Sequence, residues 1–415
     1  MKRLLLFFTL TMILAFYGCS KDEDKPDGPD NGNPDTGPVP VEKTNPMKIY
    51  VHYMPWFETP ATNNGSWGQH WTMSTRNPEI VDENGIREIA SYYYPVIGPY
   101  ASSDKDVIEY HLLMMKYAGI DGLIIDWYGS FDVYDFPLNK RNTEAVIDMM
   151  DQVGLTFALT YEDWTLNSIV DQGASTGVIE AAKEDMEYVE RNYFNLDSYT
   201  EINNKPLLTV FGPQVLQEPS QWTEVLSGIS KDPALLSLWY ELSDLGSNGS
   251  GEFAWVYEDN THCENFYKSR VSTLDIAIGG AYPGFRDYYQ DGGWGDGQGW
   301  IIDHNEGATF EITLNLAQEA QIEYLQIITW NDFGEGTMIE PTLEFGFQYL
   351  ENLQSFSGTP YSLDELEYIL KQYQLRKSSK GNSSAQNALD HSFDLLRQLK
   401  TDEAKSLLDS LDQIY

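Results

Sequence analysis

The 415-residue sequence has little cysteine and few basic side chains, and both shortages exclude classes of function. Its two cysteines are Cys19 and Cys263. A disulfide-stapled fold is therefore excluded, and a chain of this length can bury a sufficient core without one. Lysine and arginine number 26 against 64 acidic residues, which gives a net charge of −38. We therefore expect neither nucleic acid nor an anionic membrane surface as a partner.

Long apolar runs are also absent, except at the start of the chain. Leu4–Tyr17 is almost wholly apolar and follows two basic residues. It is shorter than the roughly 20 residues that a membrane-spanning helix needs, and its flanking residues are typical of a signal peptide. Cys19 follows a glycine, as at a lipoprotein cleavage site, and residues 20–24 resemble the acidic tag of surface lipoproteins in Bacteroides-type bacteria. The sequence predicts a signal peptide over 1–18 and lipidation of Cys19. We expect a protein on the outer membrane, exposed at the cell surface, that meets the membrane only through this anchor. Plain secretion is the alternative.

Composition predicts where the folded part begins. Residues 27–40 are mainly Pro, Gly, Asp and Asn and cannot form a core, so we interpret 19–46 as a flexible linker. A folded domain is expected over 47–360, and a helical extension over 361–415. Ser362 and Glu365 make a capping box for the first helix of that extension.

Eight strand candidates alternate with helical patterns in the central domain. Several are uninterrupted apolar runs, as expected when helices cover the sheet. This order predicts an α/β fold, a (β/α)8 TIM-type barrel with a C-terminal helical appendage. The helix between the fifth and sixth strands is short or missing. A doubly wound open sheet is the alternative, but no glycine-rich nucleotide loop follows the first strand. The predicted strands are Lys48–Met54, Leu123–Trp127, Thr156–Tyr161, Leu207–Phe211, Leu235–Trp239, Phe253–Val256, Ile276–Ala281 and Tyr324–Trp330.

Polar and aromatic side chains gather where these strands end. In a barrel the carboxyl ends of all strands meet at one mouth, so these side chains are predicted to converge there. Any one of them is as easily a structural polar group or an aromatic cap on the core. Together they suggest hydrogen-bonding groups and stacking platforms for sugars. The predicted substrate-binding residues are His52, Tyr53, Trp56, His70, Trp71, Asp126, Trp127, Tyr128, Glu162, Asp163, Tyr282, Trp330 and Asn331.

Asp332 and Glu335 are the predicted catalytic pair. They lie three residues apart after the last strand, and two glycines let the backbone bend around the second carboxylate. Glycosidic cleavage needs one carboxyl group to donate a proton while another is ionised. To serve as the acid at neutral pH, Glu335 needs a pKa above the ordinary value near ~4.3.

We expect no metal and no cofactor. The acids of the loop from Tyr288 to Trp300 lack the spacing of a calcium loop, and this aromatic loop is either a lid or a long surface loop. Asp303, His304 and Asn305 have catalytic residue types but no serine or cysteine nucleophile in a recognisable elbow. They bind substrate at most.

Six segments together resemble glycoside hydrolase families 99 and 71, over most of residues 47–345. The first family holds endo-acting α-mannosidases and α-mannanases, and the second holds fungal α-1,3-glucanases. The likeness implies a (β/α)8 barrel with a carboxylate pair after a late strand. The segments are HYMPWF, GQHW, GIDGLIIDWYG, TYEDW, AYPGF and WNDFGEGTMIEP.

The resemblance also implies roles for the pair. Glu335 would be the general acid and then the base, with Asp332 as its partner. In family 99 the partner acts on the substrate's own 2-hydroxyl, but that family usually has Glu at this place, and Asp332 resembles family 71 more closely. The sugar and the stereochemical outcome therefore stay open. We expect a monomeric, endo-acting glycosidase on an α-mannan or α-glucan polysaccharide or oligosaccharide. The alternative is a non-catalytic, glycan-binding surface lipoprotein.

Overall fold

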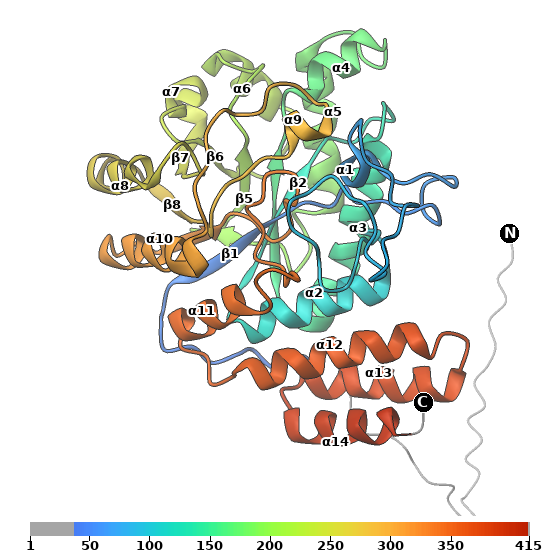
Figure 1. Ribbon diagram of the computed structural model, residues 1–415. Coiled ribbons are helices and arrows are strands. Elements are labelled where there is room, and N and C mark those ends of the chain that lie inside the picture. Colours follow the sequence, from blue (N-terminus) through green and yellow to red (C-terminus); the bar gives the residue numbers. More distant parts are fainter. Residues whose placement is uncertain (1–36, 414–415) are drawn as a thin grey trace, which may run out of the picture. The chain divides into compact units, whose positions relative to one another are not determined.

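The computed structural model describes residues 37–413, which form an eight-stranded parallel barrel with helices around it (Figure 1). The predicted signal peptide and Cys19 lie outside the described residues. Each strand pairs with its neighbours in the chain, and the β1–β9 and β3–β5 pairings close the ring. The predicted fold class is therefore confirmed. The barrel strands are β1 (Lys48–Tyr53), β2 (Gly122–Trp127), β3 (Thr156–Tyr161), β5 (Lys205–Val210), β6 (Ala234–Leu238), β7 (Gly249–Phe253), β8 (Ile276–Ala281) and β9 (Tyr324–Ile327).

One barrel strand is displaced from its predicted position and one short strand was not predicted, while the other barrel strands begin and end within three residues of their predicted bounds. β7 covers Gly249–Phe253, whereas the apolar run predicted Phe253–Val256. This strand contains glycine and serine in place of large apolar residues, so a hydrophobic pattern does not detect it. The close approach of β8 explains one of the glycines, because a Cβ on Gly251 would lie 1.8 Å from the Ile276 carbonyl oxygen. The short β4 (Glu201–Ile202) was not predicted and forms an antiparallel hairpin with β5.

Helices alternate with the strands as expected, and the helix between β6 and β7 is a single turn, as the sequence indicated. None of the helices in the described range has the length and apolar character that a membrane crossing requires. The helices preceding the C-terminal extension are α1 (Gln69–Thr72), α2 (Lys105–Tyr117), α3 (Phe136–Val153), α4 (Thr165–Asp171), α5 (Val178–Asn192), α6 (Pro219–Leu226), α7 (Leu242–Leu245), α8 (Asn260–Ser269), α9 (Tyr289–Gly292), α10 (Ala308–Glu319) and α11 (Gln348–Ser357).

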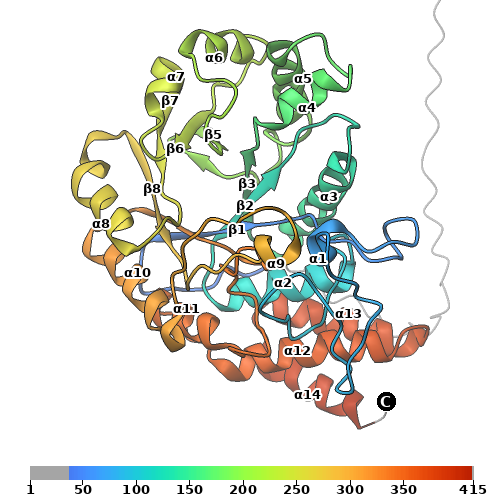
Figure 2. The ribbon, with the colours of Figure 1, turned by 45° about the horizontal axis from the view of Figure 1, so that its top comes forward.

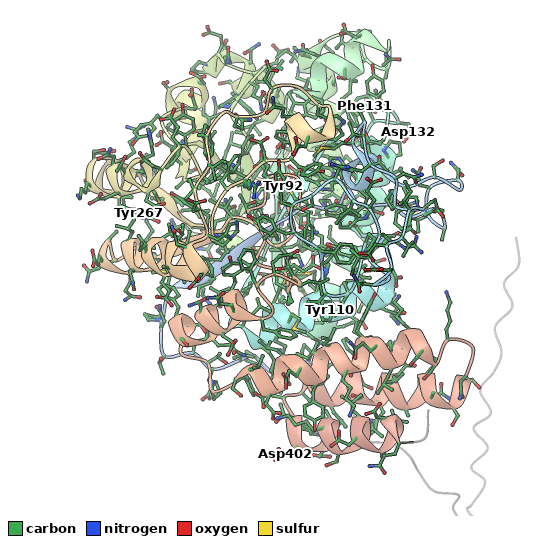
Figure 3. The ribbon with its side chains drawn as sticks, in the orientation of Figure 1. Tyr92, Tyr110, Phe131, Asp132, Tyr267 and Asp402 are labelled. Atoms are coloured by element: carbon green, nitrogen blue, oxygen red, sulfur yellow. The ribbon has the colours of Figure 1, made fainter. Side chains whose placement is uncertain are left out.

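The C-terminal extension consists of α12 (Leu363–Ser378), α13 (Ser383–Arg397) and α14 (Thr401–Asp412), which lie together along one side of the barrel (Figures 1 and 2). The predicted capping box of Ser362 and Glu365 opens α12. Tyr110 of α2 points toward α12 (Figure 3), and its ring contacts Tyr373 at 5.3 Å. The buried Arg376 guanidinium binds both carboxylate oxygens of Glu109, at 2.8 and 2.9 Å. This pair fixes the extension to the barrel.

Residues 37–46, which the sequence placed in the flexible linker, pack against the barrel instead. The Val39 carbonyl accepts a hydrogen bond from Lys116 Nζ, and the Val39 N–H donates to the Arg397 carbonyl at 3.1 Å. Lys43 forms an ion pair with Asp121 at the start of β2. The segment thus crosses the N-terminal ends of the strands, opposite the mouth.

Candidate active site

The mouth of the barrel holds a pocket of about 290 Å³ at the C-terminal ends of the strands. Its lining joins the loops after β1, β2, β8 and β9, which the barrel topology brings together. Four of the predicted site residues line it, together with residues that the sequence did not single out. The lining residues are Trp56, His70, Met73, Tyr128, Tyr289, Trp294, Asp332 and Gly334.

Flat aromatic faces make the walls of this pocket. The Trp56 and His70 rings stack with centroids 4.1 Å apart and planes within 4°. Trp294 meets His70 edge-on at 5.6 Å and stacks against Tyr289 at 6.3 Å. Burial lowers the pKa of His70 to about 3, so this imidazole is neutral at physiological pH. The walls are therefore uncharged surfaces suited to the apolar face of a sugar ring.

Asp332 is 3% exposed and lies at the start of a tight turn. Its own N–H donates to Thr329 Oγ1 at 2.8 Å, and its Oδ1 accepts from the N–H of Glu335 at 2.9 Å. Burial raises the pKa of Asp332 to about 7, while the backbone N–H groups of Glu335 and Gly334 act to lower it.

Glu335 is half-buried, and its Oε1 accepts a hydrogen bond from the Tyr289 hydroxyl at 3.0 Å. Burial raises the pKa of Glu335 to about 8, and the Asp332 charge adds to this, against the lowering effect of the Tyr289 hydrogen bond. Asp332 consequently ionises first, and between these two pKa values the pair holds one protonated and one ionised carboxyl group. Opposite protonation states are what acid–base cleavage of a glycoside needs.

Backbone hydrogen bonds fix the turn that carries Glu335 to the loop after β8. The Arg286 N–H donates to the Glu335 carbonyl, and the Tyr288 N–H donates to the Gly334 carbonyl, both at 2.8 Å. Gly336 adopts φ +66°, and a Cβ there would lie 2.8 Å from the Arg286 carbonyl oxygen. Only glycine permits this approach.

A second carboxyl pair, Asp126 and Glu162, lies at the ends of β2 and β3. Burial raises the pKa of Asp126 to about 7; the neighbouring Glu162 side chain opposes this shift, and the charge of Asp332 adds to it. Burial, followed by the charge of Asp126, raises the pKa of Glu162 well above its ordinary range. Neither carboxylate oxygen of Asp126 has a hydrogen-bond partner within residues 37–413, and the pair brings a third and a fourth carboxyl group to the mouth.

Besides Trp71, four predicted tyrosines and tryptophans do not line the pocket. Side chains alternate between the two faces of a strand, so the neighbour of an inward Asp126 points outward. Trp127 accordingly stacks on Tyr188 of α5 at 6.3 Å. Tyr53, Trp330 and Tyr282 are likewise buried, and the first two contact His111 of α2.

The other predicted residues have structural partners. Asn331 pairs with the backbone of Met54, accepting from its N–H at 2.8 Å and donating to its carbonyl at 3.0 Å. Asp163 accepts three backbone N–H groups of the loop after β5. His52 Nδ1 lies 3.3 Å from Gln326 Oε1, inside the barrel, and the buried Trp71 donates to the Tyr100 carbonyl.

Sequence reasoning missed Tyr289 and Trp294 as individual site residues. Both lie in the loop that was interpreted as a lid or a surface loop, where no periodicity indicates which side chains point inward. Their aromatic character was the only signal. Within residues 37–413, no group of three or more His, Cys, Asp or Glu side chains is placed to hold a metal ion.

A (β/α)8 barrel whose mouth joins acid–base carboxyls to aromatic walls is the architecture of a glycosidase. The model of glycosyl hydrolase family 99 matches residues 45–234. Over these residues the chain is similar to that family. The matched range ends before Asp332 and Glu335, so the assignment of these two residues depends on the site geometry.

Two named relatives are similar over a larger part of the chain, and one solved structure has a similar fold. The glycoprotein endo-α-1,2-mannosidase of Rattus norvegicus is 22% identical over 351 residues, covering 74% of this chain and 71% of the rat protein. A glycoprotein endo-α-1,2-mannosidase-like protein of Danio rerio is 22% identical and covers 70% of each chain. The structure of an endo-α-mannosidase from Bacteroides thetaiotaomicron superposes with a TM-score of 0.58 at 20% identity, covering 78% of this chain and 98% of that one. At this identity the superposition shows a shared fold.

Proposed function

We propose that this chain hydrolyses internal α-glycosidic bonds of a mannan or glucan, with Glu335 as the general acid and Asp332 as its ionised partner. The observation that carries the proposal is the pair itself. The two carboxyl groups share one turn beside an aromatic pocket, and burial and hydrogen bonding separate their pKa values in the order that the chemistry requires.

The proposed reaction follows from these protonation states. A sugar ring lies against the aromatic walls, and Glu335 gives its proton to the departing glycosidic oxygen as the C–O bond breaks. Asp332 removes a proton either from an attacking water or from the 2-hydroxyl of the sugar. In the second case the sugar oxygen closes on the anomeric carbon, and Glu335 then takes a proton from the water that opens this ring. The anomer of the product distinguishes the two routes.

Replacement of Glu335 tests the proposal. Wild-type protein incubated with yeast mannan and α-1,3-glucan is expected to release oligosaccharides from one of them. Glu335→Gln is expected to lose activity by a factor of about 10³ or more while it still binds the glycan. Glu367→Gln, on the exposed side of α12, serves as the control and should be fully active. Activity of Glu335→Gln within tenfold of wild type would refute its role.

The alternative function is glycan binding without turnover. Retention of both carboxyl groups in a buried turn, with raised pKa values, favours hydrolysis, because binding alone gains nothing from a protonated acid next to an ionised one. Binding without product release across a broad polysaccharide panel would reverse this conclusion.

The proposed location is the outer membrane, with the chain lipid-anchored and exposed at the cell surface. It is supported by the apolar start of the sequence, by the Gly18–Cys19 junction and by the acidic residues that follow. Cys19→Ala is expected to abolish fatty-acid labelling and to release the protein from the membrane fraction. Retention in the membrane fraction without labelling would contradict a lipid anchor at this cysteine.

A further inference from the structure

Glu340 is a buried acidic residue that follows the turn of the catalytic pair and that the proposed reaction does not use. Its side chain is 1% exposed and does not line the catalytic pocket. The Glu340 backbone N–H donates to the Trp330 carbonyl at 2.8 Å, so the chain returns to the start of the turn after Glu335. A carboxyl group this deeply buried is costly unless it is hydrogen-bonded, and its partners therefore indicate its role.

The partners of the Glu340 side chain come from α2 and from the loop before it. The Tyr100 hydroxyl donates to Glu340 Oε2 at 2.7 Å. His111 of α2 places its Nε2 3.3 Å from Glu340 Oε1, and its Nδ1 lies 3.2 Å from the Tyr53 hydroxyl at the end of β1. The His111 ring also meets Trp330 edge-on, with centroids 5.3 Å apart. Glu340 thus joins the segment after β9 to α2 and to the loop after β1.

The Tyr100 hydroxyl connects Glu340 to the catalytic turn. It has a single proton, which it donates to Glu340, so its oxygen is free to accept from Asn331 Nδ2 at 3.1 Å. Burial, followed by the charge of Glu340, raises the pKa of Tyr100 well above its ordinary value, and the hydroxyl therefore keeps this proton at physiological pH. Asn331, which also binds the backbone of Met54, immediately precedes Asp332. Glu340, Tyr100 and Asn331 form a continuous chain of hydrogen bonds, which we name the supporting chain.

A displacement of Asn331 would reach both carboxyl groups of the catalytic pair. Asn331 and Asp332 share a peptide bond, so the position of the first limits where the second can lie. Asp332 Oδ1 in turn accepts from the N–H of Glu335 at 2.9 Å. Catalytic rates are sensitive to such movements, since a displacement of about 1 Å can cost about 10²-fold. The supporting chain is therefore placed to control the geometry of the pair without touching the substrate.

We propose that Glu340 is a positioning residue, which acts through Tyr100 and Asn331 to keep the catalytic pair in the arrangement that cleaves the glycan. This inference depends on the proposed function, because the pair that is positioned consists of the proposed acid, Glu335, and its partner, Asp332. Neither Glu340 nor Tyr100 lines the catalytic pocket. Their loss should therefore lower kcat and leave KM nearly unchanged.

Separate measurement of kcat and KM tests the proposal, on whichever of yeast mannan and α-1,3-glucan the wild type cleaves. Tyr100→Phe and Glu340→Leu each break the supporting chain and are expected to lower kcat about tenfold to 100-fold, with KM within about twofold of wild type. Glu340→Gln keeps a carbonyl oxygen that can accept from Tyr100, so its kcat should stay within about threefold of wild type. Urea unfolding identifies the conditions in which every variant is folded, and the rates are compared there.

Tyr110→Phe is the matched control. Tyr110, which Figure 3 labels, precedes His111 in α2 and is also a buried tyrosine. Its hydroxyl has no hydrogen-bond partner within residues 37–413, so its removal breaks no contact of the supporting chain, and kcat should equal that of the wild type. The proposal is overturned, and the hydrolase assignment stands, if Tyr100→Phe and Glu340→Leu keep the wild-type kcat, or if Glu340→Gln loses as much as Glu340→Leu.

Hydrogen exchange separates this inference from the proposed function. Exchange of the backbone N–H groups of residues 329–340 is followed by mass spectrometry, with α6 as the reference for opening of the whole domain. Faster exchange relative to α6 is expected in Tyr100→Phe and Glu340→Leu, and wild-type exchange in Tyr110→Phe. If the wild type cleaves neither polysaccharide, this result would support the fixing of the turn by Glu340 while the hydrolase proposal fails. Wild-type exchange in Tyr100→Phe and Glu340→Leu would overturn the inference.

Discussion

The backbone N–H of Glu335 donates a hydrogen bond to Oδ1 of Asp332, at 2.9 Å. The turn that separates the two carboxyl groups therefore also decides which of them ionises first. A donor aimed at Asp332 stabilises its charged form, and the resulting negative charge holds the proton on Glu335. The backbone of this turn therefore makes Asp332 ionise before Glu335.

Hydrolysis should have a bell-shaped pH profile with a narrow maximum between about pH 7 and pH 8. Activity rises as Asp332, with a pKa of about 7, loses its proton, and it falls as Glu335, with a pKa of about 8, loses its own. The measurement is kcat/KM across the range from about pH 5 to about pH 10. A profile that rises monotonically toward acid pH would show that ionised Asp332 is not needed.

Tyr289→Phe should move the alkaline side of that profile to higher pH. The Tyr289 hydroxyl donates to Glu335 Oε1 at 3.0 Å and so favours the ionised carboxylate. Its removal should raise the pKa of Glu335 by up to roughly one unit, and kcat should fall because the carboxyl group is less firmly oriented. Tyr92→Phe, which loses a hydroxyl bonded to Asp291 in the same loop, is the control. An unchanged alkaline limb in Tyr289→Phe would show that this hydrogen bond does not control the acid.

Glu335→Gln should stabilise the folded chain at alkaline pH and leave its stability unchanged at acid pH. The folded-state pKa of about 8 exceeds the unfolded value near ~4.3, so the favourable contribution of Glu335 is complete below the lower value and is lost as the pH rises through the higher one. The glutamine side chain of the variant does not titrate, so the variant loses no stability in this way as the pH rises. At about pH 9 the variant should gain at least about 1 kcal/mol in urea unfolding relative to wild type. An equal difference at pH 4 and pH 9 would contradict a raised pKa.

Asn331→Ala should lower stability more than it weakens substrate binding. The buried amide satisfies both the N–H and the carbonyl of Met54, and alanine leaves these groups unpaired. We expect a loss of about 2–4 kcal/mol in the free energy of unfolding. Asn195→Ala, an exposed asparagine, should cost little. Unchanged stability together with a raised KM would instead mean that Asn331 contacts the sugar.

The sequence predicted the barrel well because its strands are apolar runs between amphipathic helices. β3 and β8 begin and end as predicted. β7 was displaced because Gly249–Phe253 contains small and polar residues where the neighbouring strand lies close, and the hydrophobic pattern registers only the apolar residues that follow. Hydrophobicity locates a strand when burial depends on large side chains, and it fails where backbones pack against each other.

The candidate site could be predicted only in part. Asp126 and Trp127 are adjacent, and both were expected at the mouth, but the two faces of a strand separate them. This separation could have been predicted from the sequence, because successive side chains of a strand point to opposite faces of the sheet. Tyr289 and Trp294 had no such signal. Their orientation depends on hydrogen bonds between the loops after β8 and β9, which are contacts between segments far apart in the chain.

Because of these hydrogen bonds, the two parts of the loop after β8 should tolerate changes in sequence and length differently. Its first residues, 286–288, are bonded to the turn of Glu335, so an insertion there would displace the acid. Beyond Tyr289 the chain could change in length or composition and leave the acid where it is. A library of swapped segments over 290–300 would therefore alter which glycan is accepted while the chemical step is preserved.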